Sequence, residues 1–271
     1  MESNPKSLIQ NAAKAQAVAK SNKQKLVDYI NGVMAEQIRR ALPSVITPER
    51  FTRMVLSALS TTPQLAECTQ DSFLGAMMTA AQLGLEPNTP LEQCFLIPRK
   101  IKGELKCVFE MGYQGLLDLA YRSNLISVVQ AHEVCDGDEF VYAYGLEPKL
   151  YHKIALTGRG AAYAYYAMFK TKDGGYGFEV TSREDVERYA RKYSDSYESS
   201  YSPWKTSFDQ MAKKTLLKQA LKYAPKKSDF VRGIEADNTI KSTLAPDMSE
   251  VPNEDDYIDA DAVVVEEKPN E

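Results

Sequence analysis

The sequence has few of the side chains that build catalytic or metal centres. It contains only two histidines, and its four cysteines lie far apart with no C-x-x-C pair. A zinc site needs clustered Cys and His ligands, so none is expected. The phosphate-binding loop G-x-x-x-x-G-K-[ST] is also absent, and nothing indicates ATP hydrolysis. We expect neither a catalytic site nor a required cofactor. Mg²⁺ is compatible with the sequence, but no motif demands it.

Long apolar runs are missing as well. No stretch of about 18 apolar residues exists that would span a membrane, and residues 1–16 lack the apolar core of a signal peptide. The isolated cysteines are typical of small core residues in a reduced compartment. These absences together predict a cytoplasmic protein without a membrane partner.

Acidic residues are scarce in one segment only. From Pro203 to Gly233 there are eight Lys or Arg and two Asp, a net charge of +6 in a chain whose total is −4. Residues 234–271 contain twelve acids and two bases, a net charge of −10. A concentrated basic segment predicts an anionic partner. The sequence therefore divides into a flexible segment 1–24, a domain over 25–233 and an acidic, disordered tail over 234–271.

Periodicity and capping signals predict an α+β class, with helices first, a mainly antiparallel sheet in the middle and helices last. The expected helices are 25–41, 48–60 (started by Thr47-Pro48), 71–83 (ended by Gly84), 113–123, one launched by the capping box Thr181–Glu184 and ending near Lys192, and one over 202–225. The expected strands are 94–97, 105–110, 126–134, 139–144, 150–154, 160–171 and 176–180, with hairpin turns at Lys102-Gly103 and at Asp173–Gly175.

The helix expected over 202–225 carries most of the positive charge. Lys214, Lys218 and Lys222 recur every four residues and would form one stripe. A second face, with Phe208, Ala212, Leu216 and Tyr223, is expected to pack inward. Such a helix displays lysines to a partner, although an ordinary solvated face explains the same pattern. Too few acids are nearby to neutralise it by intrahelical pairing.

Other features allow two interpretations each. The cluster Arg99, Lys100, Lys102 and Lys106 fits either an anion contact or a lysine-protected hairpin edge. The only tryptophan, Trp204, would stack on a base or, as we favour, fix the helix start. Tyrosines at 163, 165 and 166 fit a core better than a stacking platform, whereas those at 193, 197 and 201 fall in a polar loop and are harder to bury.

Two short motifs suggest other functions. Gly175–Val180, GYGFEV, resembles a signature of the RNA-recognition motif, but no strand–helix–strand unit precedes it, so RNA binding is the weaker alternative. The turn Asp136–Glu139 would suit a hard cation, but an ordinary acidic turn is the better interpretation. A structural oligomer that binds no nucleic acid is the third possibility.

Four separated motifs resemble the RecT family of phage single-strand annealing recombinases. They are Leu83–Pro87 (LGLEP), Phe95–Pro98 (FLIP), Met111–Ser123 (MGYQGLLDLAYRS), and Ser202–Lys205 (SPWK) with Met211–Thr215 (MAKKT). The resemblance covers about residues 45–230. The sequence departs from the family pattern at Arg99, where an aromatic residue is expected, and at Tyr121, where a second arginine is expected beside Arg122.

The resemblance implies ATP-independent annealing of single-stranded DNA by a ring or helical filament of subunits. It also implies a curved sheet backed by a helix, similar to Rad52-type proteins, and partners that include annealed duplex DNA, a phage 5′–3′ exonuclease and the host single-strand-binding protein. Gly112 and Gly115 would allow close approach of DNA or of a neighbouring subunit. The basic segments and the family motifs together give these candidate DNA-binding residues: Arg99, Lys100, Lys102, Lys106, Gln114, Arg122, Lys205, Lys213, Lys214, Lys218 and Lys222.

Overall fold

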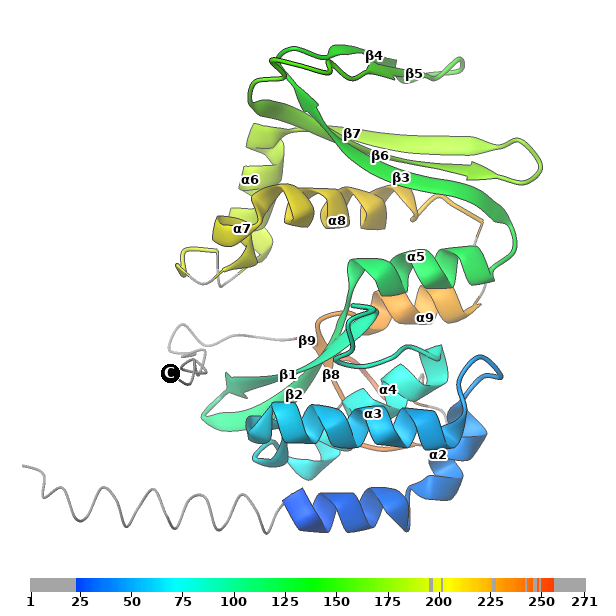
Figure 1. The fold of residues 1–271 in the computed structure, drawn as a ribbon, viewed down its shortest axis with the longest axis vertical. Coiled ribbons are helices and arrows are strands. Elements are labelled where there is room, and N and C mark those ends of the chain that lie inside the picture. Colours follow the sequence, from blue (N-terminus) through cyan, green and yellow to red (C-terminus); the bar gives the residue numbers. More distant parts are fainter. Residues whose placement is uncertain are drawn as a thin grey trace, which may run out of the picture. The chain divides into compact units, whose positions relative to one another are not determined.

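The computed structural model describes residues 23–194, 197–200, 202–225, 228–241, 243–245, 248 and 250–255 (Figure 1). They form two compact units, where the sequence suggests one domain over 25–233. Unit 1 contains the described residues up to Leu119 together with those from Ser228 onwards, and unit 2 contains those from Ala120 to Pro225. Both units combine helices with antiparallel strands, so the α+β class is confirmed.

Helices open unit 1. A helix over 23–31 is followed by α2 (Ala35–Ala41), α3 (Pro48–Thr61), the short 3₁₀ helix η1 (Pro63–Ala66) and α4 (Gln70–Leu83). The predicted signals of α3 and α4 are confirmed: the Thr47 side chain accepts a hydrogen bond from the Arg50 N–H, and Gly84 ends α4 with φ 59°. The single helix predicted over 25–41 is wrong, because a turn at 32–34 divides it and leaves Val33 60% exposed.

A hairpin forms the main part of the sheet of unit 1. Strands β1 (Cys94–Ile101) and β2 (Glu104–Met111) pair antiparallel around the predicted turn, and α5 (Tyr113–Arg122) follows. The short strands β8 (Thr239–Ile240) and β9 (Glu254–Asp255) extend the sheet in the order β1-β2-β8-β9. Helix α4 packs against β2, so the apolar centre of unit 1 lies between helix and sheet.

The C-terminal part of the described chain returns to unit 1. Helix α9 (Ser228–Ala236) is followed by Asp237, whose Oδ1 accepts a hydrogen bond of 2.7 Å from the Met111 N–H. Ile240 then completes a buried cluster with Ile101 and Val108. The sequence predicts a disordered tail from residue 234, and the structure differs. The few apolar side chains of this stretch, such as Ile240, pack against the β1–β2 hairpin. Residues 256–271 lie outside the described part.

Unit 2 is a three-layer arrangement around one antiparallel sheet (Figure 1). The sheet has the order β3-β6-β7, from β3 (Ile126–Cys135), β6 (Ala162–Thr171) and β7 (Tyr176–Ser182). The hairpin β4 (Glu139–Ala143) and β5 (Lys149–Lys153) covers one face. On the other face α8 (Phe208–Ala220) packs against all three strands, after α6 (Arg183–Tyr193) and the single-turn helix α7 (Pro203–Thr206).

Successive side chains of β6 point to opposite faces of the sheet, so the strand contributes to the packing on the α8 face and on the hairpin face. Tyr165 is fully buried on the side of α8, where its hydroxyl donates a hydrogen bond of 2.5 Å to Asp209 Oδ1. Tyr166 is buried on the side of the hairpin with Phe140. These two tyrosines are core residues as predicted, whereas Tyr163 is 45% exposed. The capping box of α6 lies one residue later than predicted, because Ser182 rather than Thr181 accepts from the Asp185 N–H.

Candidate nucleic-acid interface

The basic segment of unit 2 is not one helix. It is divided into α7 and α8 at Ser207, which has φ −145° and ψ 49°, and α8 ends at Ala220. The sequence predicts an unbroken helix to Pro225, so the stripe of Lys214, Lys218 and Lys222 is only partly helical. Lys222 follows the helix and is exposed, while the other two lie on α8 and are half-buried.

The inward face of α8 holds the helix against the sheet. Ala212 and Leu216 are buried as predicted, and Phe208 contacts Tyr165 with ring centroids 6.0 Å apart. Tyr223, predicted to pack with them, is instead 79% exposed, because it lies beyond the end of the helix. Burial of this face leaves the basic side chains to solvent or to polar partners.

Lys213 points to the sheet rather than away from it. Its Nζ lies 3.1 Å from Oε2 of Glu133 on β3, and the Lys213 side chain is only 19% exposed. Glu133 also contacts Arg159, whose guanidinium binds Asp138 at 2.8 Å. Burial raises the pKa of Glu133, but the hydrogen bonds from Lys213 and Arg159 outweigh it, and the pKa lies below its usual value. This lysine is therefore part of a charge network inside unit 2.

The start of the basic segment is fixed by packing. Trp204 is buried and its ring meets that of Phe208 at 5.7 Å, so the interpretation as a core residue is confirmed. The neighbouring Lys205 is exposed, with its Nζ 4.3 Å from the ring centre of Tyr197 and 3.6 Å from Glu198. Of the loop tyrosines, Tyr197 is buried and Tyr193 is exposed. The third, Tyr201, lies outside the described residues.

The second basic cluster lies on the β1–β2 hairpin of unit 1. Arg99 and Lys106 are directly paired across the two strands and so share one face of the sheet. Arg99 also binds Glu110 at 3.1 Å, which compensates its charge. Lys100 and Lys102 are exposed, and Lys102 occupies the turn with φ 50°.

The glycines of the Gly-Tyr-Gln-Gly motif allow two backbone segments of the same chain to approach closely. A Cβ on Gly112 would lie 1.9 Å from the Glu92 carbonyl oxygen, and one on Gly115 would lie 2.0 Å from that of Gln93. Backbone of the same chain fills the space of the missing side chains, so both glycines are explained without the predicted approach of DNA or of a second subunit. Gln114, between them, is exposed on the first turn of α5.

Tyr121 replaces an expected arginine and has a structural contact. Its hydroxyl accepts a hydrogen bond of 3.0 Å from the Val129 N–H, which ties the end of α5 to β3. Arg122, the next residue, is half-buried at the end of α5. The structure thus brings the predicted residues together in two groups, one in each unit. Unit 1 contains Arg99, Lys100, Lys102, Lys106 and Gln114, and unit 2 contains Arg122, Lys205, Lys213, Lys214, Lys218 and Lys222.

Sequence reasoning missed a basic and aromatic surface on α6. Arg191 lies over the ring of Tyr197 at 5.3 Å, and Lys192 lies over that of Tyr193 at 4.9 Å. The Tyr189 ring packs against Tyr193 with centroids 4.6 Å apart. The run RYARKY places tyrosines four residues apart with bases between them, which is the signal that would have indicated this surface.

The acidic turn 136–139 is structural. The side chain of Asp138 is fully buried and accepts hydrogen bonds from the Cys135 and Ala155 N–H groups and from Arg159. His152 Nε2 lies 3.2 Å from the same carboxylate. All acceptor positions of Asp138 are thus used by protein donors, and across the described residues no group of His, Cys, Asp or Glu could hold a metal ion.

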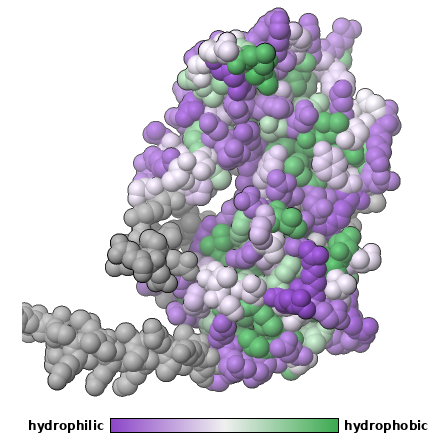
Figure 2. Space-filling model, viewed as in Figure 1, coloured by the Kyte–Doolittle hydropathy of each residue, from purple (hydrophilic) through white to green (hydrophobic). Residues whose placement is uncertain are grey.

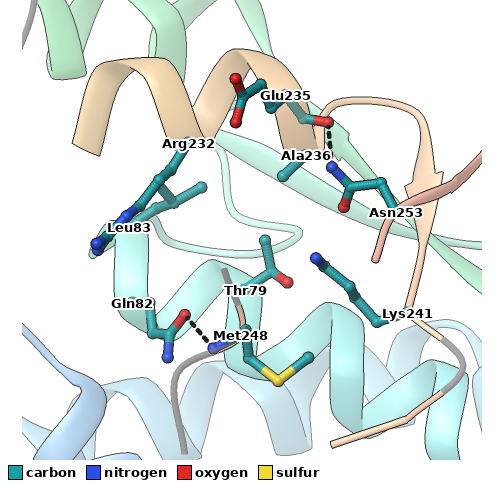
Figure 3. A pocket seen from close by; sticks show the side chains of 9 residues that line it. All are labelled: Thr79, Gln82, Leu83, Arg232, Glu235, Ala236, Lys241, Met248 and Asn253. Atoms are coloured by element: carbon teal, nitrogen blue, oxygen red, sulfur yellow. Dashed lines mark hydrogen bonds between the residues drawn. The ribbon is translucent and has the colours of Figure 1, made fainter. Parts of the chain in front are cut away.

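A small pocket in unit 1 is polar but narrow (Figure 3). It has a volume of about 60 Å³, room for a few water molecules only. Gln82 accepts from the Met248 N–H across it, and Asn253 donates to the Glu235 carbonyl (Figure 3). Lys241, buried beside it, donates to the Val251 carbonyl oxygen. The pocket marks where the returning C-terminal segment meets α4 and α9.

The surface shown in Figure 2 is mostly hydrophilic, with separate apolar patches. Exposed apolar side chains on the β4–β5 hairpin and its connections include Val141, Leu146 and Leu156. None of the helices in the described part of the chain has the length and apolarity that crossing a bilayer requires. The topology of unit 2 excludes the RNA-recognition fold, since no helix lies between β3 and the β6–β7 hairpin, where that fold requires one.

Basic side chains gathered on a folded α+β scaffold are typical of a nucleic-acid-binding protein. The model of the RecT family matches residues 49–256. The chain is 34% identical to Protein RecT of Escherichia coli over 83% of its length and 85% of the relative. It is 26% identical to uncharacterized protein YqaK of Bacillus subtilis over 64% of its length and 57% of that protein. The chain belongs to the RecT family, and its function is single-strand annealing in DNA recombination.

Proposed function

We propose that this protein binds single-stranded DNA through lysines on both units and pairs complementary strands without nucleotide hydrolysis, as an oligomer. The observation that carries the proposal is the outward side of α8 and the turn after it. There Lys214 and Lys218 lie on α8 and Lys222 just after it, while the other face of the helix is buried against the sheet. Lysine contacts to phosphate give affinity without sequence preference, which an annealing protein needs.

The contacts of each predicted residue refine the proposed interface. Arg99 and Lys213 are bound to carboxylates, so we assign them to positioning the surface. We propose phosphate contacts by Lys100, Lys102, Lys106, Lys205, Lys214, Lys218 and Lys222, with Gln114 and Arg122 from α5. Lys205 would exchange its contact of 3.6 Å with the exposed Glu198 for one with phosphate. With about five phosphates bound per subunit, log K is expected to fall with log salt at a slope of roughly −3.5.

Assembly supports this mechanism physically. One subunit covers few nucleotides and binds weakly, whereas a ring or filament multiplies phosphate contacts along the same strand. The antiparallel β3-β6-β7 sheet with α8 across one face supports a relationship to Rad52-type annealing folds. We further propose a phage origin, a bacterial cytoplasmic location, and cooperation with a 5′–3′ exonuclease and the host single-strand-binding protein. Mg²⁺ is compatible with this function, but no motif requires it.

The test is an annealing assay without nucleotide. Complementary labelled oligonucleotides are mixed with the protein while strand pairing is followed by fluorescence and particle size by light scattering. We expect faster pairing together with large, DNA-dependent particles. Assembly that is indifferent to DNA, with no acceleration of pairing, would show a structural oligomer and overturn the proposal. Monomeric binding to RNA with base selectivity would overturn it as well.

A further inference from the structure

An aromatic hollow of about 230 Å³ lies beside strand β7, at the edge of the sheet of unit 2. Its walls come from the segment after β4, from β6 and β7, and from the turn after α8. Six lining residues carry the argument: Tyr144, Phe169, Tyr176, Phe178, Glu179 and Tyr223. The volume is below the roughly 300–1,000 Å³ of pockets that enclose drug-sized ligands, so it suits a single ring system.

Two of the aromatic walls are fixed in place. The Tyr144 ring stacks on Phe178 with centroids 5.2 Å apart and planes 24° apart, and its hydroxyl accepts a 2.8 Å hydrogen bond from the Val180 N–H. The Tyr176 hydroxyl donates to the Pro148 carbonyl oxygen at 2.9 Å. These rings are therefore pre-organised and lose little conformational entropy when a ligand binds.

Strand β7 approaches the Phe169 ring closely at Gly177. Gly177 has no side chain, and a Cβ there would lie 2.7 Å from Cε1 of the buried Phe169 ring. The ring of Phe169 thus lies against the backbone of β7. A larger residue at 177 would need that ring to move.

The Tyr223 side chain is not part of the core. It is 79% exposed, and its ring contacts no other ring among the described residues. A large exposed aromatic side chain at the rim of a hollow is typical of a stacking contact. Glu179 is the one acid of the lining; its carboxylate interacts with the Tyr144 hydroxyl and can accept a further hydrogen bond from an N–H edge.

Three lysines are neighbours of lining residues in the sequence or in the strand register, as are the acids Glu147 and Glu179. Lys149 follows the lining residue Pro148, Lys170 is paired with Tyr176 across β6 and β7, and Lys222 precedes Tyr223. All three are exposed, and none is bound to an acid of the described residues. A ligand that matches these contacts has a planar ring with N–H donors and carries anionic groups on more than one side of that ring.

We propose that this hollow receives an unstacked base of the bound strand, while Lys149, Lys170 and Lys222 contact the flanking phosphates. The inference rests on the proposed single-strand binding and adds a base site to it. Holding one base out of the stack would keep its neighbours extended and available to a complementary strand. An aromatic side chain from a second copy of the protein is the competing occupant, and the neighbouring lysines favour the nucleotide.

The test compares an oligodeoxycytidylate strand with a strand of equal length in which every base is replaced by an abasic tetrahydrofuran. Wild type should bind the intact strand between about fivefold and a hundredfold more tightly, the range that stacking of one base gives. Tyr223→Ala and Tyr176→Ala should reduce this ratio and leave the affinity for the abasic strand unchanged. Tyr151→Ala is the control, because Tyr151 is 43% exposed on β5 and does not line the hollow.

Three results would overturn the inference while leaving single-strand binding intact. The first is equal binding of both strands by wild type. The second is a loss by Tyr223→Ala that is equal for the two strands, which indicates a backbone contact. The third is unchanged affinity with smaller particles for Tyr223→Ala, which indicates a second copy in the hollow. If wild type binds neither strand, the proposed function fails and the base site with it.

Discussion

Lys213 Nζ lies 3.1 Å from Glu133 Oε2, so one lysine of the basic segment is bound to the sheet that α8 covers. Removing it with Lys213→Ala leaves the partly buried Glu133 carboxylate with only Arg159. We expect the free energy of unfolding to fall by about 1 kcal/mol, as is typical of a partly exposed pair. The salt slope of DNA binding should not change. Urea unfolding and a salt titration measure the two effects.

Lys222→Ala is the matched comparison, because this lysine is exposed and lies after the helix end. Its loss should leave stability unchanged and make the slope of log K against log salt less steep by about 0.7, the value for one phosphate contact on a single strand. If Lys213→Ala instead changes the salt slope and Lys222→Ala lowers the stability, Lys213 is the phosphate ligand and the assignment is wrong.

Gly115→Ala should destabilise unit 1. The new Cβ would meet the Gln93 carbonyl oxygen at 2.0 Å, and backbone cannot move aside as a flexible side chain can. We expect a loss of at least roughly 1–3 kcal/mol, the usual cost of overpacking, measured by thermal unfolding. Gln114→Ala, at the exposed neighbouring position, is the control for stability. A stable Gly115→Ala protein that no longer binds DNA would instead show that this glycine faces DNA.

The Asp138 carboxylate should make unit 2 sensitive to acid. The hydrogen bond from Arg159 is the largest cause that holds the pKa of Asp138 far below its usual value; burial opposes it, and the Cys135 and Ala155 N–H groups and His152 add to it. The ionised form therefore contributes stability that is fully present above the unfolded pKa of about 3.9 and is lost as the pH falls towards the folded pKa.

Asp138→Asn should accordingly be less stable than wild type at pH 7 and should lose less stability between about pH 4 and pH 2. Thermal unfolding monitored across this range measures both effects. Asp136→Asn, at an exposed position two residues earlier, should behave like wild type. Parallel pH profiles for wild type and Asp138→Asn would contradict the proposed coupling to Arg159.

Truncation after Asp255 should strengthen DNA binding at low salt. It removes six acids and one base, a net charge of −5, and spares the buried Ile240 and Val251. We expect a gain of about twofold to tenfold that shrinks as salt screens the charge. A chain of full length with the six acids changed to Asn or Gln separates charge from length. Deletion from residue 234 is unsuitable, because it also removes the buried Ile240 and should destabilise unit 1.

Local signals predicted much of the fold because they act over a few residues. Thr47-Pro48, Gly84 and the turn at Lys102-Gly103 work through caps and backbone angles, and the structure has each of them where the sequence places it. The break at Ser207 was missed, because the favourable helical pattern continues across it in the sequence, whereas the structure packs Trp204 on Phe208 across the break.

The candidate site was less predictable than the fold for a similar reason. Charge density indicated the basic segment, but which lysines are bound depends on partners distant in sequence, such as Glu133 for Lys213. Gly112 and Gly115 were interpreted as sites where DNA or a neighbouring subunit approaches, because the carbonyls of Glu92 and Gln93 become their neighbours only after folding. Tyr223 fits a helical periodicity that ends at Ala220, so its exposure follows from where the helix stops.

The Met111–Asp237 hydrogen bond joins residues separated by 126 positions, and unit 2 is contained within that separation. On the ribosome, unit 2 is therefore finished before β8 has been synthesised. Until then β2 lacks its neighbouring strand, and Ile101 and Val108 lack Ile240. Nascent unit 1 should therefore expose apolar surface for longer than unit 2. Chaperones should bind this surface until β8 has left the exit tunnel.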